Sequence, residues 1–145
     1  MASLLASVLD RDAVRIGYAT VDFESAVRGL LAHELIARGV SPNRVDAIVN
    51  AVQKREETGS TCSGPIALPH ARCEMLPGII AGLGINPNGI WPNAETRVML
   101  AFVSPVDAAG EHLRFLSSAA KALRDPVLRS QILEARTEDE VLALL

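Results

Sequence analysis

Residues 97–103, RVMLAFV, constrain the fold of this chain more than any other stretch. Only apolar residues follow Arg97, so an extended strand here would present apolar side chains on both faces. Such a strand is typical of a sheet that is covered on each side. The run is also far shorter than the roughly 20 apolar residues that a membrane-spanning helix needs. We therefore predict a fully buried strand inside a layered domain.

Helical patterns flank short extended segments elsewhere in the chain. Apolar residues recur every three or four positions within residues 22–38, which predicts an amphipathic helix. Residues 41–59 predict a second helix, in which Ser41 caps the N-terminus, Pro42 takes the first helical position and Gly59 follows the end.

The remaining segments continue this alternation. Short strands are expected at residues 13–16, 65–69 and 79–85, and glycines weaken the last of these. Helices are expected over residues 111–123, from Asp125 to about Ala135, and after a capping box at residues 137–140. Alternating helices and strands predict an α/β layered domain. The length of 145 residues suits a single domain spanning residues 1–145.

Charge and cysteine content restrict the partners and the location. The net charge is −3 and the Lys and Arg residues are scattered, whereas nucleic-acid binding calls for a clustered basic face. The N-terminus has no basic residue before Arg11, so we expect no secretory signal and no membrane insertion. Two cysteines, Cys62 and Cys73, are too few for a disulfide scaffold. We expect a cytoplasmic protein without a nucleic-acid partner.

Three histidines are the first candidates for chemistry. His33 lies beside the apolar stripe of a helix, which favours a surface or partly buried structural role. His112 falls in the first turn of a helix, where a cation is mildly unfavourable with the helix dipole. Position alone therefore favours an ordinary polar role for His112 as well.

His70 has a more informative context. It ends an apolar run and follows Pro69, which restricts the backbone, and a side chain at the end of a strand can project into a crevice. The preceding loop, residues 59–64, offers hydroxyl groups and backbone N–H groups that suit an anion. Arg55 and Arg72 are close in sequence. These residues fit either a phosphoryl-binding histidine or a structural turn histidine.

Other chemistries have weaker support. Cys62, His70 and Cys73 do not have the spacing of a zinc motif, and no fourth ligand is evident. A Cys-His nucleophilic pair has no orienting group at a recognisable position. The glycines of residues 82–89 are not followed by a helix, as a nucleotide-binding loop would be. We expect neither a metal nor a cofactor.

Residues 55–72, REETGSTCSGPIALPHAR, resemble the active-site signature of enzyme IIA domains of the phosphotransferase system, of the fructose/mannitol and nitrogen-regulatory type. That signature joins an Arg-Glu pair, a Ser-Thr pair, a glycine-rich loop and an apolar run ending in Pro-His. Residues 77–92, 98–105 and 112–123 follow in the family's order, so the resemblance covers nearly the whole chain.

The resemblance implies a mixed β-sheet sandwiched between helices and a phosphotransferase activity. His70 matches the histidine that accepts a phosphoryl group from a small histidine phosphocarrier protein. His112 matches a second histidine that hydrogen-bonds this group, and Arg55 matches an arginine that neutralises its charge. Ser60 and Thr61 match the hydroxyl residues of the phosphate-binding loop. No metal or cofactor is implied.

The destination of the phosphoryl group is open, and so is a second class of function. A IIB component of a sugar transporter would accept the group, or the phosphorylation state would itself be a regulatory signal. The loop before His70 is one residue shorter than the usual pattern, with Cys62 and Pro65 at altered positions. This loop motivates the alternative of a non-catalytic module that binds a protein target. The joint presence of His70, His112 and Arg55 favours the carrier.

Overall fold

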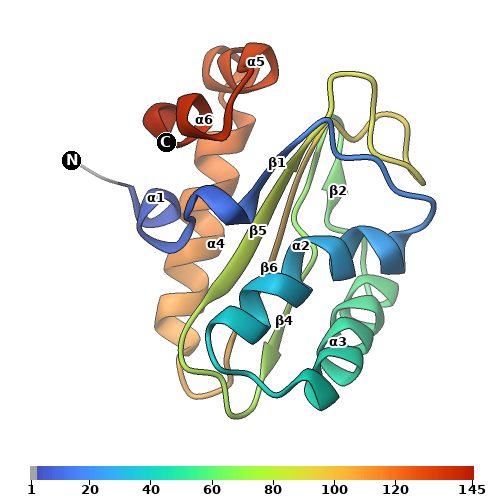
Figure 1. Cartoon of the computed structure of the whole chain (residues 1–145), viewed down its shortest axis with the longest axis vertical. Coiled ribbons are helices and arrows are strands. Elements are labelled where there is room, and N and C mark those ends of the chain that lie inside the picture. Colours follow the sequence, from blue (N-terminus) through green and yellow to red (C-terminus); the bar gives the residue numbers. More distant parts are fainter. Residues whose placement is uncertain (1–2) are drawn as a thin grey trace.

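Within residues 3–145, which the computed structural model describes, six strands form one mixed sheet between two layers of helices (Figure 1). The strands are β1 (Val14–Ile16), β2 (Cys62–Ser63), β3 (Ile66–Ala67), β4 (His70–Cys73), β5 (Ile80–Ile85) and β6 (Val98–Pro105). β1 runs parallel to β5, β5 antiparallel to β6, β3 and β4 parallel to β6, and β2 antiparallel to β3. The predicted α/β class, with a mixed sheet between helices, is confirmed.

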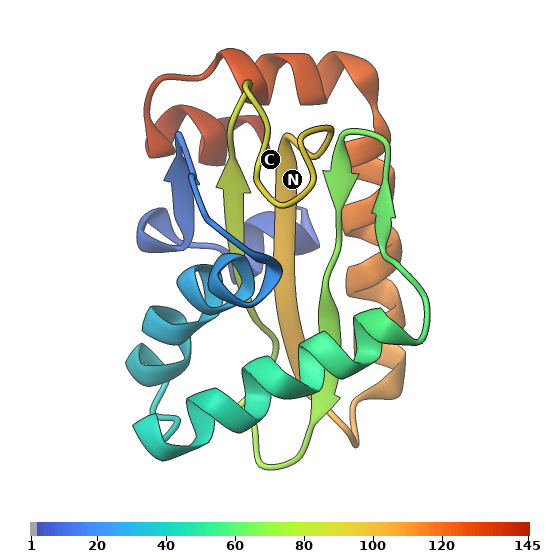
Figure 2. The ribbon, with the colours of Figure 1, turned by 90° about the vertical axis from the view of Figure 1, so that its right-hand side faces the viewer.

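Helices cover both faces of the sheet (Figure 2). One face carries α2 (Phe23–Ala37) and α3 (Val45–Glu57), the latter preceded by the 3₁₀ turn η2 (Pro42–Arg44). The opposite face carries α1 (Leu4–Val8), the 3₁₀ turn η1 (Arg11–Ala13), α4 (Ala109–Arg124), α5 (Pro126–Glu134) and α6 (Glu138–Leu144). The apolar side chains accordingly divide into one core on each side of the sheet.

β6 is the central strand and is buried along almost its whole length, as predicted. Alternate residues point to opposite faces of a strand. Met99, Ala101 and Val103 belong to the core under α2 and α3. Val98, Leu100 and Phe102 belong to the core under α4. The strand continues two residues beyond its expected end, through Ser104 and Pro105.

The segment before the candidate histidine differs from the prediction. The strand expected over residues 65–69 is shortened to β3, and a second short strand that was not expected, β4, follows it. Both pair with β6, and His70 begins β4 rather than ending a strand. Pro69 lies in the break because a proline has no N–H to give to the ladder. Its carbonyl still accepts a hydrogen bond from the Phe102 N–H at 3.0 Å. This bond and the pairing of β4 with β6 keep His70 aligned with the sheet.

One helix start and one additional helix also differ from the prediction. Ser41 makes no side-chain cap hydrogen bond to the described residues, and the α-helix begins only at Val45. The Arg44 N–H bonds the Ser41 carbonyl at 2.9 Å, three residues back, and so closes a 3₁₀ turn of the kind common at helix ends. The short helix α1 was not expected, because five residues are too few to show a helical period.

The glycines of β5 serve close packing rather than weakening the strand. β5 is buried along all six residues. A Cβ on Gly82 would overlap the carbonyl oxygen of Leu30 on α2. A Cβ on Gly84 would run into the ring of Tyr18, whose hydroxyl donates to the Ala26 carbonyl at 2.6 Å. The absence of a side chain at Gly82 allows the backbone of α2 to lie directly on the sheet, and that at Gly84 makes room for the Tyr18 ring.

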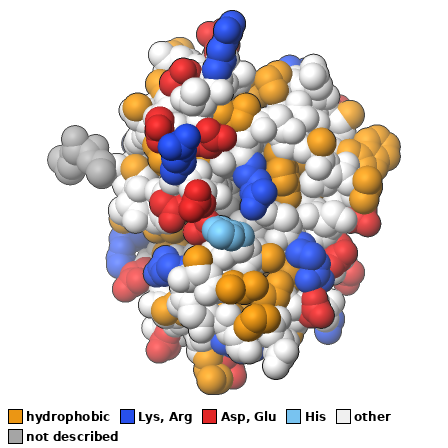
Figure 3. Space-filling view, viewed as in Figure 1, with side chains coloured by type: hydrophobic (Ala, Val, Ile, Leu, Met, Phe, Trp, Pro, Cys, Tyr) orange, Lys and Arg blue, Asp and Glu red, His pale blue; other side chains and the backbone are white. Residues whose placement is uncertain are grey.

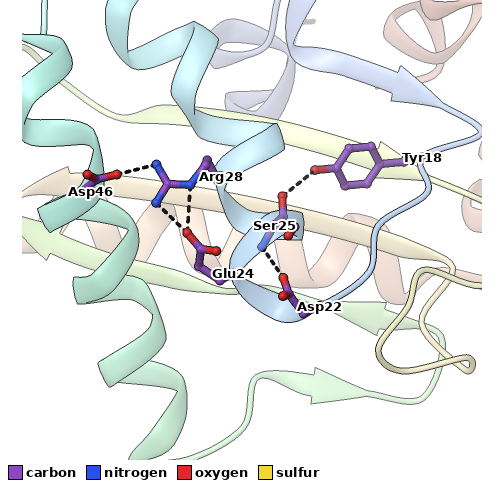
Figure 4. A network of polar contacts seen from close by, with 6 residues as sticks. All are labelled: Tyr18, Asp22, Glu24, Ser25, Arg28 and Asp46. Carbon is purple, nitrogen blue, oxygen red and sulfur yellow. Dashed lines mark hydrogen bonds and ion pairs between the residues drawn. The ribbon is translucent and has the colours of Figure 1, made fainter.

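Polar contacts fasten α2 to its surroundings (Figure 4). Asp22 caps the helix, and its carboxylate accepts the Ser25 N–H at 2.7 Å. The Arg28 guanidinium lies between Glu24, one turn earlier, and Asp46 on α3. These ion pairs are partly exposed, so solvent screens them and they orient α2 against α3 more than they stabilise the fold.

The surface carries mixed charge. On the face drawn in Figure 3, basic and acidic side chains are interspersed. In the part of the chain that the structure describes, every helix is too short or too polar to cross a membrane.

Candidate functional site

A cavity of about 620 Å³ opens between the loop before β3, the start of β4 and the outer side of α4. His70, Arg55, Ser60 and Thr61 line it, so the structure brings four of the five predicted site residues to one hollow. On its far side α4 contributes cationic and apolar side chains, among them Leu113, Lys121 and Arg124.

The fifth predicted residue, His112, lies next to His70. The two ring centroids are 5.3 Å apart and the ring planes are inclined by 57°. His70 is 6% exposed and His112 is 7% exposed. One ring comes from β4 and the other from the first turn of α4, and the fold places them side by side, as expected.

Phe102 of β6 is the platform beneath both histidines. It is the register partner of His70, and the two rings stack at a centroid distance of 5.0 Å and an angle of 16°. The ring centroid of His112 lies 5.5 Å from that of Phe102, and Phe115 packs edge-on against Phe102 at 4.8 Å. The sequence predicts Phe102 only as part of a buried strand, because its contact with the site depends on the register of β4 on β6.

The hydrogen bond of His70 defines its tautomer. Its Nδ1 lies 2.6 Å from the Leu68 carbonyl oxygen. A carbonyl only accepts, so Nδ1 carries the proton and Nε2 of the neutral ring holds a lone pair. Burial, and then the positive charge of Arg55, hold the pKa of His70 below its ordinary value of 6.5, against the opposing effect of this bond. A neutral imidazole with a free Nε2 is a competent nucleophile.

His112 is also held in its neutral form. Burial lowers the pKa of His112 most, and the nearby His70, Arg72 and Arg55 lower it further. Its Nδ1 lies 2.5 Å from the hydroxyl oxygen of Ser104, at the end of β6. The expected strand ended at Val103, so the contact with Ser104 was not predicted. Ser104 is the next residue on the β6 face that carries Val98, Leu100 and Phe102, and the docking of α4 on this face brings it to His112.

Arg55 sits in the last turn of α3, on the rim of the cavity. Its guanidinium donates to the Gly59 carbonyl at 3.0 Å and to the Thr58 hydroxyl at 3.4 Å. It therefore fastens the start of the loop while remaining exposed to solvent beside the cavity.

The two loop hydroxyls are not equivalent. Thr61 gives both its backbone N–H and its hydroxyl proton to the Glu56 carboxylate, at 2.8 and 2.5 Å. A hydroxyl has one proton, so that of Thr61 is already committed. Ser60 accepts the Cys62 N–H at 3.1 Å and keeps its own proton for a ligand. Glu56, the second member of the Arg-Glu pair, thus holds the loop at Thr61, as Arg55 does at Gly59.

The other candidates lie elsewhere or form no site. His33 is exposed on α2 and lines a separate depression of about 780 Å³, in keeping with its expected surface role. In the described part of the chain both cysteines are free, Cys62 on the cavity wall and Cys73 buried in the core. Residues 3–145 contain no group of three or more His, Cys, Asp or Glu side chains that could hold a metal ion.

Comparison with known proteins identifies the family. The family described as "Phosphoenolpyruvate-dependent sugar phosphotransferase system, EIIA 2" matches residues 7–145. The nitrogen regulatory protein of Escherichia coli (strain K12) is 29% identical over 151 residues, covering 97% of this chain and 88% of that protein.

Two solved structures share the fold. Nitrogen regulatory protein IIA-Ntr from Neisseria meningitidis superimposes with a TM-score of 0.83 at 19% identity, over 98% of this chain and 99% of the other. A complex of enzyme IIA and phosphorylated enzyme IIB for mannitol from Escherichia coli gives a TM-score of 0.71 at 21% identity, over 94% and 95%. With the match over residues 7–145, the chain belongs to the EIIA type 2 family of the phosphotransferase system, whose members are phosphotransfer components.

Proposed function

We propose that this chain is a phosphoryl carrier in which His70 accepts a phosphoryl group from a small histidine phosphocarrier protein and passes it on. The proposal rests on one observation, the protonation and the surroundings of the His70 ring. Its Nδ1–H is bound to the Leu68 carbonyl, its pKa is lowered, and its ring lines an open cavity. Nε2 is the nitrogen left to react.

The transfer needs no acid or base from this chain. The Nε2 lone pair of His70 forms the new bond to phosphorus as the bond to the carrier's imidazole breaks. The electron pair of the breaking bond returns to the carrier's ring, which leaves as a neutral imidazole when its other nitrogen holds a proton. His70 keeps its own proton on Nδ1, and the Leu68 carbonyl stabilises that N–H as positive charge develops on the ring.

Positioning and charge stabilisation are the contributions that such a transfer requires. We assign charge stabilisation on the phosphoryl oxygens to Arg55, to the Ser60 hydroxyl and to His112. Thr61 acts through the loop instead, because its proton is held by Glu56. Arg55 would exchange its contact with the Gly59 carbonyl for a phosphoryl oxygen, a stronger charge-assisted partner.

The same cavity rim suits the docking of a protein partner. Leu113 is 64% exposed one residue after His112, and Lys121 and Arg124 lie further along α4. A carrier with an apolar patch and acidic neighbours would complement this surface. We expect the phosphoryl group to pass to a IIB component of a sugar transporter, or the phosphorylated state to act as a regulatory signal. In either case we expect the protein to work in the cytoplasm. The IIA–IIB complex for mannitol supports the first destination, and the nitrogen regulatory relative supports the second.

The test is incubation of the purified chain with phosphoenolpyruvate, the first enzyme of the system and its histidine phosphocarrier, followed by intact mass measurement. The wild type should gain one acid-labile phosphoryl group and His70→Ala none, while the surface control His33→Ala should be labelled normally. Labelling of His70→Ala to the wild-type level would disprove the assignment. An unlabelled wild type that still captures a protein target would favour the non-catalytic module.

A further inference from the structure

Ser104 is a polar residue at the end of an apolar row. Residues two apart in a strand share a face, so Ser104 continues the face of β6 that carries Leu100 and Phe102. Its side chain is fully buried, with 0% exposure. A buried hydroxyl is costly unless it is hydrogen-bonded, and here the partner is a member of the candidate site.

The hydrogen bond between Ser104 and His112 has a direction that can be deduced. Ser104 Oγ lies 2.5 Å from His112 Nδ1, and the residues described give this hydroxyl no second partner. If Nδ1 carried the proton and donated it, the hydroxyl proton of Ser104 would be buried without an acceptor. The satisfied arrangement has Ser104 donating to a lone pair on Nδ1.

This direction determines what His112 offers to the site. A neutral imidazole with a bare Nδ1 carries its proton on Nε2. His70 has the opposite arrangement, since its Nδ1 donates to the Leu68 carbonyl. The two neighbouring rings therefore differ at Nε2, where His70 has a lone pair and His112 has a proton.

We propose that Ser104 is a positioning residue that holds His112 in its Nε2–H tautomer, and so makes the neutral ring a hydrogen-bond donor to a phosphoryl group on His70. The opposite tautomer would turn a lone pair toward the phosphoryl oxygens and repel them. The role in transfer rests on the proposed carrier function. The tautomer is a property of the unphosphorylated chain and can be tested without it.

The first test is nuclear magnetic resonance of the unphosphorylated, ¹⁵N-labelled protein, with long-range ¹H–¹⁵N correlations that assign the proton on each ring. In the wild type, His112 should be protonated on Nε2 and His70 on Nδ1. In Ser104→Ala, His112 should become a mixture of tautomers, while His70 is unchanged. Ser104→Thr, which keeps a hydroxyl, should retain the wild-type pattern. The partly buried helix residue Ser118 supplies the control, and Ser118→Ala should change neither ring.

Two results would overturn the proposal. One is a wild-type His112 protonated on Nδ1, which needs no variant to fold. The other is a folded Ser104→Ala in which His112 remains wholly in the Nε2–H form.

The second test separates an effect through His112 from a general effect on the fold. Transfer rates are measured for the wild type, Ser104→Ala, His112→Gln and the double variant. Loss of one preorganised hydrogen-bond donor greatly lowers the rate of a reaction that builds up negative charge. Because Ser104→Ala leaves the Nε2–H donor of His112 only partly populated, it should slow phosphoryl transfer by roughly ten-fold. In the His112→Gln background the same change should have no further effect. An equal slowing in both backgrounds would rule out action through His112. A wild type that takes up no phosphoryl group would refute the carrier function and leave the tautomer result standing.

Discussion

The rings of His70 and His112 lie 5.3 Å apart between centroids, and both pack against the ring of Phe102, at 5.0 and 5.5 Å. One histidine begins an edge segment of the sheet, and the other comes from the first turn of the helix that covers it. Burial of the pair explains why the pKa of each is lowered, since a charged imidazole loses hydration there.

Stability should fall as the solution becomes acidic. Between the ordinary pKa of 6.5 and the lowered pKa values of His70 and His112, the unfolded chain binds more protons than the folded chain. The stabilisation is therefore complete above pH 6.5 and is lost as the pH falls toward the folded-state pKa values. Urea unfolding at pH 7.5 and at pH 5.5 should show this loss.

The matched control for that measurement is the double variant His70→Gln, His112→Gln. The variant lacks the two imidazoles but keeps every other titrating group of the wild type. Its loss of unfolding free energy between the two pH values should therefore be smaller. An equal loss in both proteins would show that the two imidazoles are not the groups responsible.

Glu56→Ala should slow phosphoryl transfer with little change in melting temperature. The carboxylate accepts two hydrogen bonds from Thr61 and so holds the loop against the end of α3. Charge-assisted bonds of this kind are about twice as strong as neutral ones. We expect a rate loss of roughly ten-fold, or about 1.4 kcal/mol. The exposed neighbour Glu57 is the control, and Glu57→Ala should transfer normally. Indistinguishable rates for the two variants would remove Glu56 from the site.

Arg55→Ala should separate a catalytic role from a structural one. A cation in the last turn of a helix contributes at most ~1 kcal/mol through the helix dipole. Contact with a phosphoryl group is a larger effect, and its loss should slow transfer to His70 ten-fold or more. Arg55→Lys should recover part of the rate, because an ammonium group cannot make a bidentate contact. Lys54→Ala serves as the neighbouring control. A lowered melting temperature with an unchanged rate would leave Arg55 as a loop fastener only.

Gly82→Ala should destabilise the fold severely. The added Cβ would overlap the backbone of Leu30, which cannot move without displacing α2 from the sheet. Overpacking of this kind costs about 1–3 kcal/mol and more where backbone is involved. Gly110→Ala is the contrasting variant, since Gly110 is exposed in the first turn of α4, and alanine there should stabilise the helix. Thermal unfolding of the two variants should give shifts of opposite sign, and a Gly82→Ala protein as stable as the wild type would contradict the packing described.

The sequence alone determined the class of the fold and most of its elements. The apolar run at residues 98–103 became β6, and the stripe at residues 22–38 became α2, because periodicity and end signals are local properties of the chain. The same locality explains the errors. The strand expected over residues 65–69 ends at Ala67, and Pro69 separates it from the unexpected strand β4. The 3₁₀ turn at residues 42–44 replaced the first turn of the second expected helix. In both places the backbone changes although the apolar pattern does not.

The sequence also contained the motif that pointed to His70 and Arg55, since residue type and spacing are sufficient for a resemblance. Only the tertiary structure decided what touches His70 and His112. Phe102 meets His70 through the register of β4 on β6, and Ser104 meets His112 through the docking of α4 on the same strand. Register and docking are set by packing between segments distant in the chain, so no local pattern reports them. The proton on each ring follows from those contacts, which is why the two histidines acquire different roles only in the folded chain.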